Sequence, residues 1–280
     1  MTQLRTEFGF QEAAAIAAGC QGANQIMNNL ESKVAVVSGA GRGIGRSIAI
    51  ALARAGADVV GCSRTVSELE SLASEINQLG RRCATARVDV ADWENVKHFA
   101  ETVVAEFGRC DILVNNAGGT FAEGELADSD PALWTKTVDI NLYGTYFLTR
   151  ALLADIPSGG KIINIASGMG LAALPGNSSY AAAKAAVHML TQVLSQEVWE
   201  RGIEVNDVIP GLVATTNVTW ASDRSSVDTV LAEFADRPVP FAASERVKHP
   251  DEVGELVAWM AGLPPWGPTG QSFSLARRPL

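Results

Sequence analysis

Tyr180 and Lys184 stand four residues apart in the segment SSYAAAKAAV, residues 178–187. This spacing places both side chains on one face of a helix, one turn apart. A free phenol has a pKa of about 10, and a nearby cation favours its ionised form. We therefore predict that Lys184 lowers the pKa of Tyr180 and that the tyrosine acts as an acid and base. Taken alone, the pair also fits an ordinary surface contact on a helix.

A glycine-rich turn is the second group of residues with chemical potential. The apolar run KVAVVSG leads into Gly39, Gly41, Gly43 and Gly45, and a helical stretch follows. Glycines between a strand and a helix let the backbone approach a pyrophosphate, which the helix N-terminus stabilises. The pattern is GxxxGxG rather than GxGxxG. It predicts a nucleotide site, whereas a tight turn without a ligand is the alternative.

The end of the second apolar run indicates which nucleotide binds. An NAD-binding domain carries Asp or Glu there, about 20 residues past the glycines, to hold the ribose hydroxyls. This chain has Ser63 and Arg64 at that place, and Arg42 lies inside the glycine turn. A guanidinium matches the geometry of a phosphate. Two cations without a carboxylate predict NADP, although both arginines also fit solvated surface positions.

Alternating strands and helices must position these groups. Strand-like runs occupy residues 33–39, 57–64, 82–90, 110–118, 160–167, 203–211 and 269–276, and helical stretches, including a long one over 131–155, lie between them. Nearly continuous apolar runs separated by helices predict a parallel sheet that is buried on both faces. We predict an α/β fold, a single Rossmann-like doubly wound domain with a seven-stranded parallel sheet flanked by helices.

The domain organisation follows from the same pattern. Residues 1–30 are rich in Ala, Gly, Gln and Asn and lie outside it, so we expect a flexible N-terminal extension. Residues 31–280 are expected to form one NADP-binding catalytic domain, with a substrate loop at about 214–245.

Composition excludes several classes of function. Lys and Arg total 22 against 31 Asp and Glu, for a net charge of −9, and no basic run is present. We therefore expect no nucleic-acid partner and no anionic membrane partner. No apolar run approaches the roughly 18 residues of a membrane span, and a cytoplasmic location is expected. The four cysteines and three histidines are scattered, so neither a metal site nor a disulfide framework is predicted.

In chain order, the glycine turn, NNAG at 115–118, YAAAK at 180–184 and the pair Pro210–Gly211 resemble the short-chain dehydrogenase/reductase family. The resemblance covers roughly residues 32–275. YxxxK alone is a weak signal, and the specificity comes from several motifs in one order. The resemblance implies hydride transfer between a nicotinamide and a ketone or secondary alcohol.

The resemblance also assigns roles to residues. Tyr180 matches the catalytic acid/base and Lys184 its partner, while Ser167 and Asn141 complete a catalytic tetrad. The implied cofactor contacts are Gly39, Gly41, Arg42, Gly43, Ile44, Gly45, Ser63, Arg64, Asp89, Val90, Asn116, Ala117, Gly118, Tyr180, Lys184, Pro210, Gly211, Val213 and Thr215. The implied substrate contacts are Gly119, Thr120, Ser167, Met169, Tyr180 and Trp220.

We therefore predict an NADP(H)-dependent oxidoreductase, a keto reductase or alcohol dehydrogenase, that acts on a small carbonyl or alcohol. A 3-oxoacyl thioester reductase, a sugar dehydrogenase and a catalytically silent NADP sensor are the alternatives. The resemblance further implies a homodimer or homotetramer built on the helices at 131–155 and 175–200. Arg277 and Arg278 depart from the acidic, glycine-containing tail of the family. They fit a salt bridge, open solvent or an anionic substrate.

Overall fold

The computed structural model of the protein describes residues 30–216, 218, 221–236 and 245–276. The predicted N-terminal extension lies outside these residues except for Leu30. That side chain is buried in the core, and its N–H donates to the carbonyl of Ala55 at 3.1 Å. Leu30 is thus part of the packed domain. Arg277 and Arg278 also lie outside the described residues.

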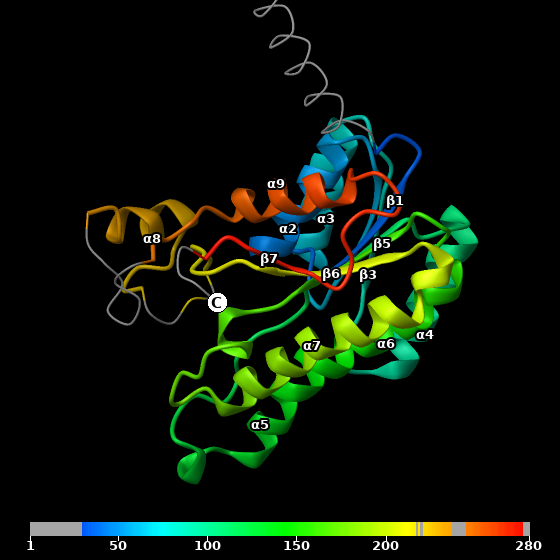
Figure 1. Ribbon diagram of the computed structural model, residues 1–280. Coiled ribbons are helices and arrows are strands. Elements are labelled where there is room, and N and C mark those ends of the chain that lie inside the picture. Colours follow the sequence, from blue (N-terminus) through cyan, green and yellow to red (C-terminus); the bar gives the residue numbers. More distant parts are fainter. Residues whose placement is uncertain (1–29, 217, 219–220, 237–244, 277–280) are drawn as a thin grey trace, which may run out of the picture.

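Seven parallel strands form one sheet in the order β3-β2-β1-β4-β5-β6-β7 (Figure 1). The strands are β1 (Val34–Ser38), β2 (Asp58–Ser63), β3 (Cys83–Arg87), β4 (Ile112–Asn115), β5 (Lys161–Ile165), β6 (Glu204–Ile209) and β7 (Ser272–Ser274). The predicted seven-stranded doubly wound sheet is therefore confirmed. The strand order reverses between β1 and β4, and parallel sheets of this kind bind ligands at the carboxyl ends of the strands next to such a reversal.

Helices cover both faces of the sheet. The α-helices are α2 (Gly43–Arg54), α3 (Val66–Gln78), α4 (Trp93–Phe107), α5 (Pro131–Val138), α6 (Gly144–Leu152), α7 (Ser178–Glu197), α8 (Val227–Glu233) and α9 (Pro250–Ala261). In Figure 1, α2, α3 and α9 lie above the sheet, whereas α4, α6 and α7 lie below it.

Alternate residues of β1 show how the two layers are built. Ala35 and Val37 belong to the core cluster that includes residues of α2, α3 and α9. Val34 and Val36 belong to the cluster that includes residues of α4, α6 and α7. Because each strand face meets a helical layer, both sets of alternate residues are apolar, and the strand reads as one continuous apolar run.

The long helix predicted over 131–155 is divided in the structure. Between α5 and α6 the backbone forms a π-helical segment, Asp139–Tyr143, and a 3₁₀ turn, Leu153–Asp155, follows α6. Periodicity alone does not distinguish a π segment from an α-helix, because the helical direction of the chain is preserved. Single-turn π segments inside helices are frequent at functional sites.

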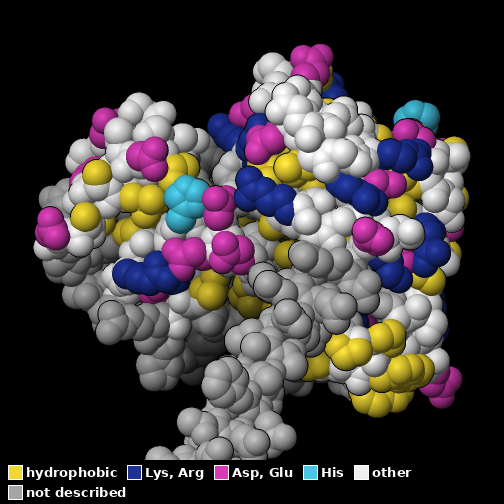
Figure 2. Space-filling model, turned by 90° about the horizontal axis from the view of Figure 1, so that it is seen from above, with side chains coloured by type: hydrophobic (Ala, Val, Ile, Leu, Met, Phe, Trp, Pro, Cys, Tyr) yellow, Lys and Arg dark blue, Asp and Glu magenta, His cyan; other side chains and the backbone are white. Residues whose placement is uncertain are grey.

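Charges of both signs are interspersed on the outer face seen in Figure 2, which is the molecule from above the view of Figure 1. Lys and Arg side chains lie next to Asp and Glu side chains over this face. Among the residues drawn in colour, this face therefore lacks the uniform positive field that attracts nucleic acids. Within the described part of the chain, every helix is too short or too polar to cross a bilayer.

Candidate active site

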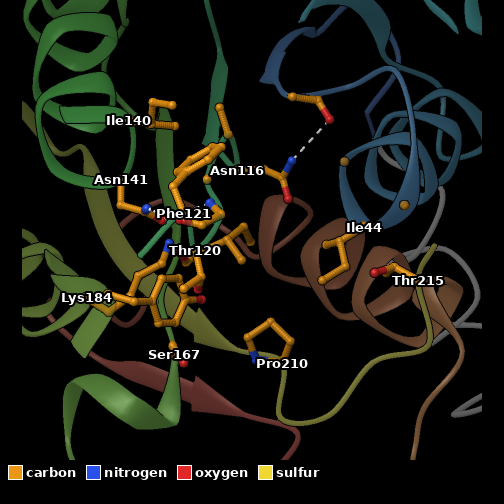
Figure 3. Close-up of a pocket in the computed structure, with 18 of the residues that line it drawn as sticks. Ile44, Asn116, Thr120, Phe121, Ile140, Asn141, Ser167, Lys184, Pro210 and Thr215 are labelled. Atoms are coloured by element: carbon orange, nitrogen blue, oxygen red, sulfur yellow. Dashed lines mark hydrogen bonds between the residues drawn. The ribbon is translucent and has the colours of Figure 1, made fainter. Parts of the chain in front are cut away.

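A cleft of about 900 Å³ opens at the carboxyl ends of the strands. All the predicted site residues line it except Trp220, which lies outside the described residues. Asn141, Ser167 and Lys184 lie on one side of the cleft, and Ile44 and Thr215 lie on the other (Figure 3). The fold thus brings residues from six separate motifs to one place.

The glycine turn is locked to the loop after β4. The hydroxyl of Ser38 accepts hydrogen bonds from the backbone N–H groups of Asn116 and Ala117, each at 3.0 Å. The Asn116 side chain donates back to the carbonyl of Ser38 at 2.9 Å. Asn116 therefore orders the turn rather than aiming its amide into the cleft.

The N-terminus of α2 opens at the cleft without a capping side chain. Its N-cap residue, Arg42, makes no side-chain hydrogen bond to the helix end, and the first turn holds no acidic residue. By contrast, Asp92 caps α4 and Asp130 caps α5. Free N–H groups at a helix end attract an anion. The residues of this turn therefore fit the pyrophosphate of a dinucleotide.

The adenosine end of the cleft holds Arg42, Arg64 and Ser63, as predicted, together with Glu68 of α3. A carboxylate was not expected here, because none follows β2 directly in the sequence. Glu68 reaches the cleft from the first turn of α3, and its Oε1 lies 3.8 Å from Arg42 Nε. This end of the cleft therefore carries two guanidinium groups and the carboxylate of Glu68, and the predicted cofactor contact Asp89 also lines the cleft.

Asn141 lies in the π segment, and side chains there replace lost backbone hydrogen bonds. Asn141 Nδ2 donates to the carbonyl of Thr137 at 2.8 Å, and Thr145 Oγ1 donates to the carbonyl of Asn141 at 2.9 Å. Asn141 Nδ2 also donates to the carbonyl of Gly119 at 2.7 Å. The wide turn thus carries a buried amide that holds the loop after β4. The spacing of Thr137, Asn141 and Thr145 was the available sequence signal.

Gly118 separates Asn141 from Lys184. A Cβ at Gly118 would lie 2.5 Å from Asn141 Oδ1 and 3.5 Å from Lys184 Nζ. The absent side chain leaves the space in which these two polar groups approach each other from α7 and the π segment. A glycine is therefore required here for the geometry of the site.

Tyr180 and Ser167 form the hydrogen-bonded centre of the catalytic group. Burial raises the pKa of Tyr180, and the hydrogen bond with Ser167 opposes this rise. The prediction that Lys184 lowers the pKa of the phenol is therefore wrong for the protein without cofactor. The reason is geometric, because Lys184 Nζ donates to the carbonyl of Ile165 at 2.7 Å and lies 5.6 Å from the centre of the Tyr180 ring.

Lys184 is itself perturbed. Burial lowers its pKa from 10.5 to about 8, and the negative charge of Asp207 partly opposes this change. A lysine with such a pKa exchanges its proton near neutral pH, as acid–base chemistry requires.

Apolar side chains line much of the remaining part of the cleft, and the polar side chains of Glu123 and Asn177 also line it. The apolar ones are Phe121, Met169, Leu174, Pro175 and Val218. Only Met169 was predicted; the others lie in loops whose course depends on the packing of segments far apart in the chain. Gly124 N–H, for example, donates to the carbonyl of Gly176 at 2.9 Å, which joins the loops after β4 and β5.

Comparison with known proteins identifies this architecture. A family model described as short chain dehydrogenase matches residues 33–226. The chain belongs to the short-chain dehydrogenase family. The match extends from β1 into the segment before α8, so it includes the glycine turn and the catalytic group.

Individual relatives of this short-chain dehydrogenase differ in their described cofactors. It is 40% identical over 227 residues to an uncharacterized oxidoreductase of Mycobacterium tuberculosis, covering 78% of this chain and 85% of the relative. An uncharacterized NAD-dependent oxidoreductase of the same species is 33% identical over 257 residues, covering 84% and 90%. A short chain dehydrogenase of Burkholderia cenocepacia solved in complex with NADP is 32% identical, with a TM-score of 0.77 and coverage of 88% and 97%.

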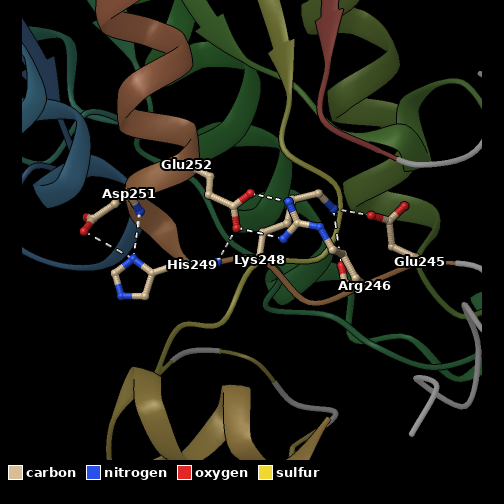
Figure 4. A network of polar contacts seen from close by, with 6 residues as sticks. All are labelled: Glu245, Arg246, Lys248, His249, Asp251 and Glu252. Carbon is tan, nitrogen blue, oxygen red and sulfur yellow. Dashed lines mark hydrogen bonds and ion pairs between the residues drawn. The ribbon is translucent and has the colours of Figure 1, made fainter. Parts of the chain in front are cut away.

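The two ends of the predicted substrate loop are joined next to the cleft. Val213 and Lys248 form an isolated parallel bridge, in which Ala214 N–H donates to the Lys248 carbonyl at 2.9 Å. The buried Lys248 ammonium pairs with Glu245, and a Cβ at Gly211 would lie 2.8 Å from Lys248 Nζ. Figure 4 shows this pair beside a second one.

The second pair joins the loop base to α9. Arg246 Nη1 donates to Glu252 Oε1 at 2.8 Å, and the N–H of His249 donates to the same oxygen at 3.0 Å. These contacts tie residues 245–249 to the helix that follows them. No cluster of His, Cys, Asp and Glu with the geometry of a metal site occurs among the described residues.

Proposed function

We propose that this protein is an NADP(H)-dependent ketone reductase that also runs as a secondary-alcohol dehydrogenase. The observation that carries the proposal is the group of Ser167, Tyr180, Lys184 and Asn141 on the wall of the cleft, in which Lys184 and Asn141 are buried. A nicotinamide dinucleotide, when bound, supplies or accepts the hydride. The residues of the chain bind and orient it and move the proton.

The two hydroxyl groups have distinct tasks in the proposed reaction. Ser167 Oγ accepts a hydrogen bond from the N–H of Met169 at 3.2 Å, which fixes the oxygen of the hydroxyl that donates to the substrate oxygen in the proposed reaction. A donor aimed at that oxygen stabilises the negative charge that develops on it. Tyr180 then delivers a proton to the same oxygen.

The preference for NADP rests on Arg42 and Arg64, which line the adenosine end together. Each is able to pair with a 2′-phosphate. Glu68 weakens this preference, because its carboxylate repels a phosphate and already pairs with the guanidinium of Arg42. The proposed enzyme therefore prefers NADPH over NADH by a smaller factor than two unopposed arginines would provide.

The substrate end favours a neutral ketone. Apart from Lys184, the described residues that line the cleft contribute cations only at the adenosine end, Arg42 and Arg64. A carboxylate or phosphate on the substrate would therefore lack a cationic partner there, which disfavours sugar acids. An apolar ketone and the neutral acyl portion of a 3-oxoacyl thioester both fit the walls formed by Phe121 and Leu174.

The test is NADPH oxidation by the purified protein with aliphatic and aromatic ketones, 3-oxoacyl thioesters and keto-sugars. Turnover should occur with a neutral ketone class and disappear in Tyr180→Phe, while NADPH binding is retained. Tyr146→Phe, a change at an exposed tyrosine of α6, is the matched control and should keep full activity. Undiminished turnover in Tyr180→Phe would remove the acid–base assignment. NADPH binding without turnover of any class would favour the sensor alternative.

We also propose a homodimer or homotetramer. Leu133, Tyr146, Met189 and Val193, from α5, α6 and α7, are large apolar residues exposed on the surface. Covering them with a second copy would bury apolar area. Sedimentation analysis should give a mass of two or four chains, and Met189→Lys should shift it toward one. A monomeric wild-type protein would contradict this.

A further inference from the structure

A row of polar side chains crosses the sheet beneath α7. Asn115, Asn164, Asp207 and Ser272 are register partners in β4, β5, β6 and β7. The two asparagines are joined to each other and to α7, since Asn115 Nδ2 donates to Asn164 Oδ1 at 2.8 Å and Asn164 Nδ2 donates to Thr191 Oγ1 at 2.8 Å. Asp207 is the one charged member of this row.

Asp207 is 1% exposed, and burial of an ionised carboxylate is costly unless it is paired. One oxygen, Oδ2, lies 2.8 Å from His188 Nδ1. The other, Oδ1, is buried and has no hydrogen-bond partner among the described residues. The catalytic group described above does not use this carboxylate directly, so its presence requires another explanation.

Helix α7 directs His188 and Lys184 toward this carboxylate. The two residues are four apart and share one helix face with Tyr180. Lys184 Nζ is held at the carbonyl of Ile165, which adjoins Asn164, the register partner of Asp207. The ammonium therefore contacts β5 one residue from the register partner of Asp207, which lies on the adjacent strand β6.

The tautomer of His188 follows from its second contact. Gln192 Nε2 lies 2.9 Å from His188 Nε2. With the amide nitrogen as donor, His188 Nε2 accepts and the ring proton is on Nδ1, which lies 2.8 Å from Asp207 Oδ2 and 3.1 Å from Ser272 Oγ. Neutral His188 thus holds the carboxylate in its ionised form without itself being charged.

We propose that Asp207, oriented by His188, is a positioning residue that keeps Lys184 charged beneath Tyr180. The inference rests on the proposed function for the role of Lys184. The groups that face Asp207 are Lys184 and His188 from α7, Asn164 from β5 and Ser272 from β7. Burial raises the pKa of Asp207, and the contacts with Ser272, His188 and Lys184 oppose this. Lys184 supplies the one cation among them when His188 is neutral.

The effect of removing this charge has a definite sign. Loss of a nearby negative charge makes the ammonium of Lys184 less favourable and the phenolate of Tyr180 more favourable. The pKa values of both groups therefore fall. In the reduction direction both groups must carry their protons, so activity should be lost at a lower pH than in the wild type.

The experiment compares Asp207→Asn with the wild type by two readouts. The full-length protein is labelled with [ε-¹³C]lysine, the Lys184 signal is assigned with Lys184→Arg, and its titration is followed by NMR. The basic limb of kcat/KM for ketone reduction is measured in parallel. Both midpoints should fall by about one pH unit. Glu197→Gln removes the same charge from an exposed position of α7 and should leave both unchanged.

An unchanged Lys184 midpoint in folded Asp207→Asn would overturn the proposal. Should this variant not fold, His188→Leu tests the same point by removing the Nδ1 donor, whereas His188→Asn keeps an N–H donor at that place. The midpoint should fall in the leucine variant and stay in the asparagine variant; equal behaviour of the two would overturn the proposal. Because the NMR titration needs no substrate, it separates this inference from the proposed reaction, which Tyr180→Phe tests.

Discussion

Arg42 Nε lies 3.8 Å from Glu68 Oε1 at the adenosine end of the cleft. A Cβ on Gly41 would lie 2.8 Å from Glu68 Oε2 and 3.0 Å from Ser63 Oγ, so the carboxylate sits directly against the glycine turn. An anion in this place interacts unfavourably with a 2′-phosphate, and a carboxylate is also the group that holds ribose hydroxyls in NAD-binding domains. Under the proposed function, we therefore expect a residue of α3 to influence the choice between the two cofactors.

Glu68→Gln should raise the affinity for NADPH about tenfold, or ~1.4 kcal/mol, and change that for NADH much less. The substitution removes a repelling charge and frees Arg42 for the phosphate. Dissociation constants of both cofactors, measured by fluorescence titration at constant ionic strength, check the ratio. Glu70→Gln, at an exposed position of the same helix, is the control. An equal gain for both cofactors would show that Glu68 does not discriminate between them.

Gly118→Ala should lower kcat about a hundredfold in a protein that still folds. The added Cβ would lie 2.5 Å from Asn141 Oδ1, and displacement of a supporting group by an ångström costs rates of this order. Gly119→Ala changes the neighbouring residue of the same site, but its Cβ would meet only the Phe121 ring, at 3.7 Å, so kcat should fall much less than in Gly118→Ala. Comparable rates for the two variants would contradict the space requirement at Gly118. Circular dichroism of both variants checks the fold.

Lys184→Met should abolish turnover and yet raise the free energy of unfolding at pH 7. Folding lowers the pKa of Lys184 from 10.5 to about 8, so the charged lysine opposes folding at pH values below about 8. The loss of its hydrogen bond to Ile165 offsets part of this, which leaves a gain of about 1–2 kcal/mol. The gain should shrink as the pH rises from 8 to 10.5. Urea denaturation at pH 7 and pH 10 measures both values, and a gain that grows with pH would contradict the assignment.

Lys161→Met should lower the free energy of unfolding by about 3–5 kcal/mol, because it leaves the carboxylate of Glu204 buried without its cation. Lys161 Nζ lies 2.5 Å from Glu204 Oε2, and both side chains are buried. Lys33→Met is the control: Lys33 is half-exposed, and its partner Asp111 keeps Arg109, so a loss of at most about 1 kcal/mol is expected. Chemical denaturation compares the two, and similar losses would mean that burial does not set the cost.

The sequence was informative where local pattern and tertiary structure agree. The central strands β1, β2 and β4 carry nearly continuous apolar runs, and motifs end those runs, so the sheet and the lining of the cleft could be predicted. The position of Glu68 at the cleft could not be predicted, because it depends on how α3 packs against the glycine turn. The predicted direction of the pKa shift of Tyr180 was also wrong. The four-residue spacing fixes the helix face on which Lys184 lies, but it does not fix the group to which Lys184 Nζ donates. The π segment at Asn141 is too short to be seen in the periodicity, and the spacing of Thr137, Asn141 and Thr145 was its one sequence signal.

The bridge between Val213 and Lys248 has an evolutionary consequence. The bridge joins the two ends of the stretch between these residues. The buried ion pair of Lys248 with Glu245 lies close to Gly211 and stabilises this junction. Insertions, deletions or exchanges within the stretch then need not disturb the catalytic side chains, which are held by α7 and the π segment. Changes in this stretch, the predicted substrate loop, could thus alter the substrate range while the catalytic side chains stay the same.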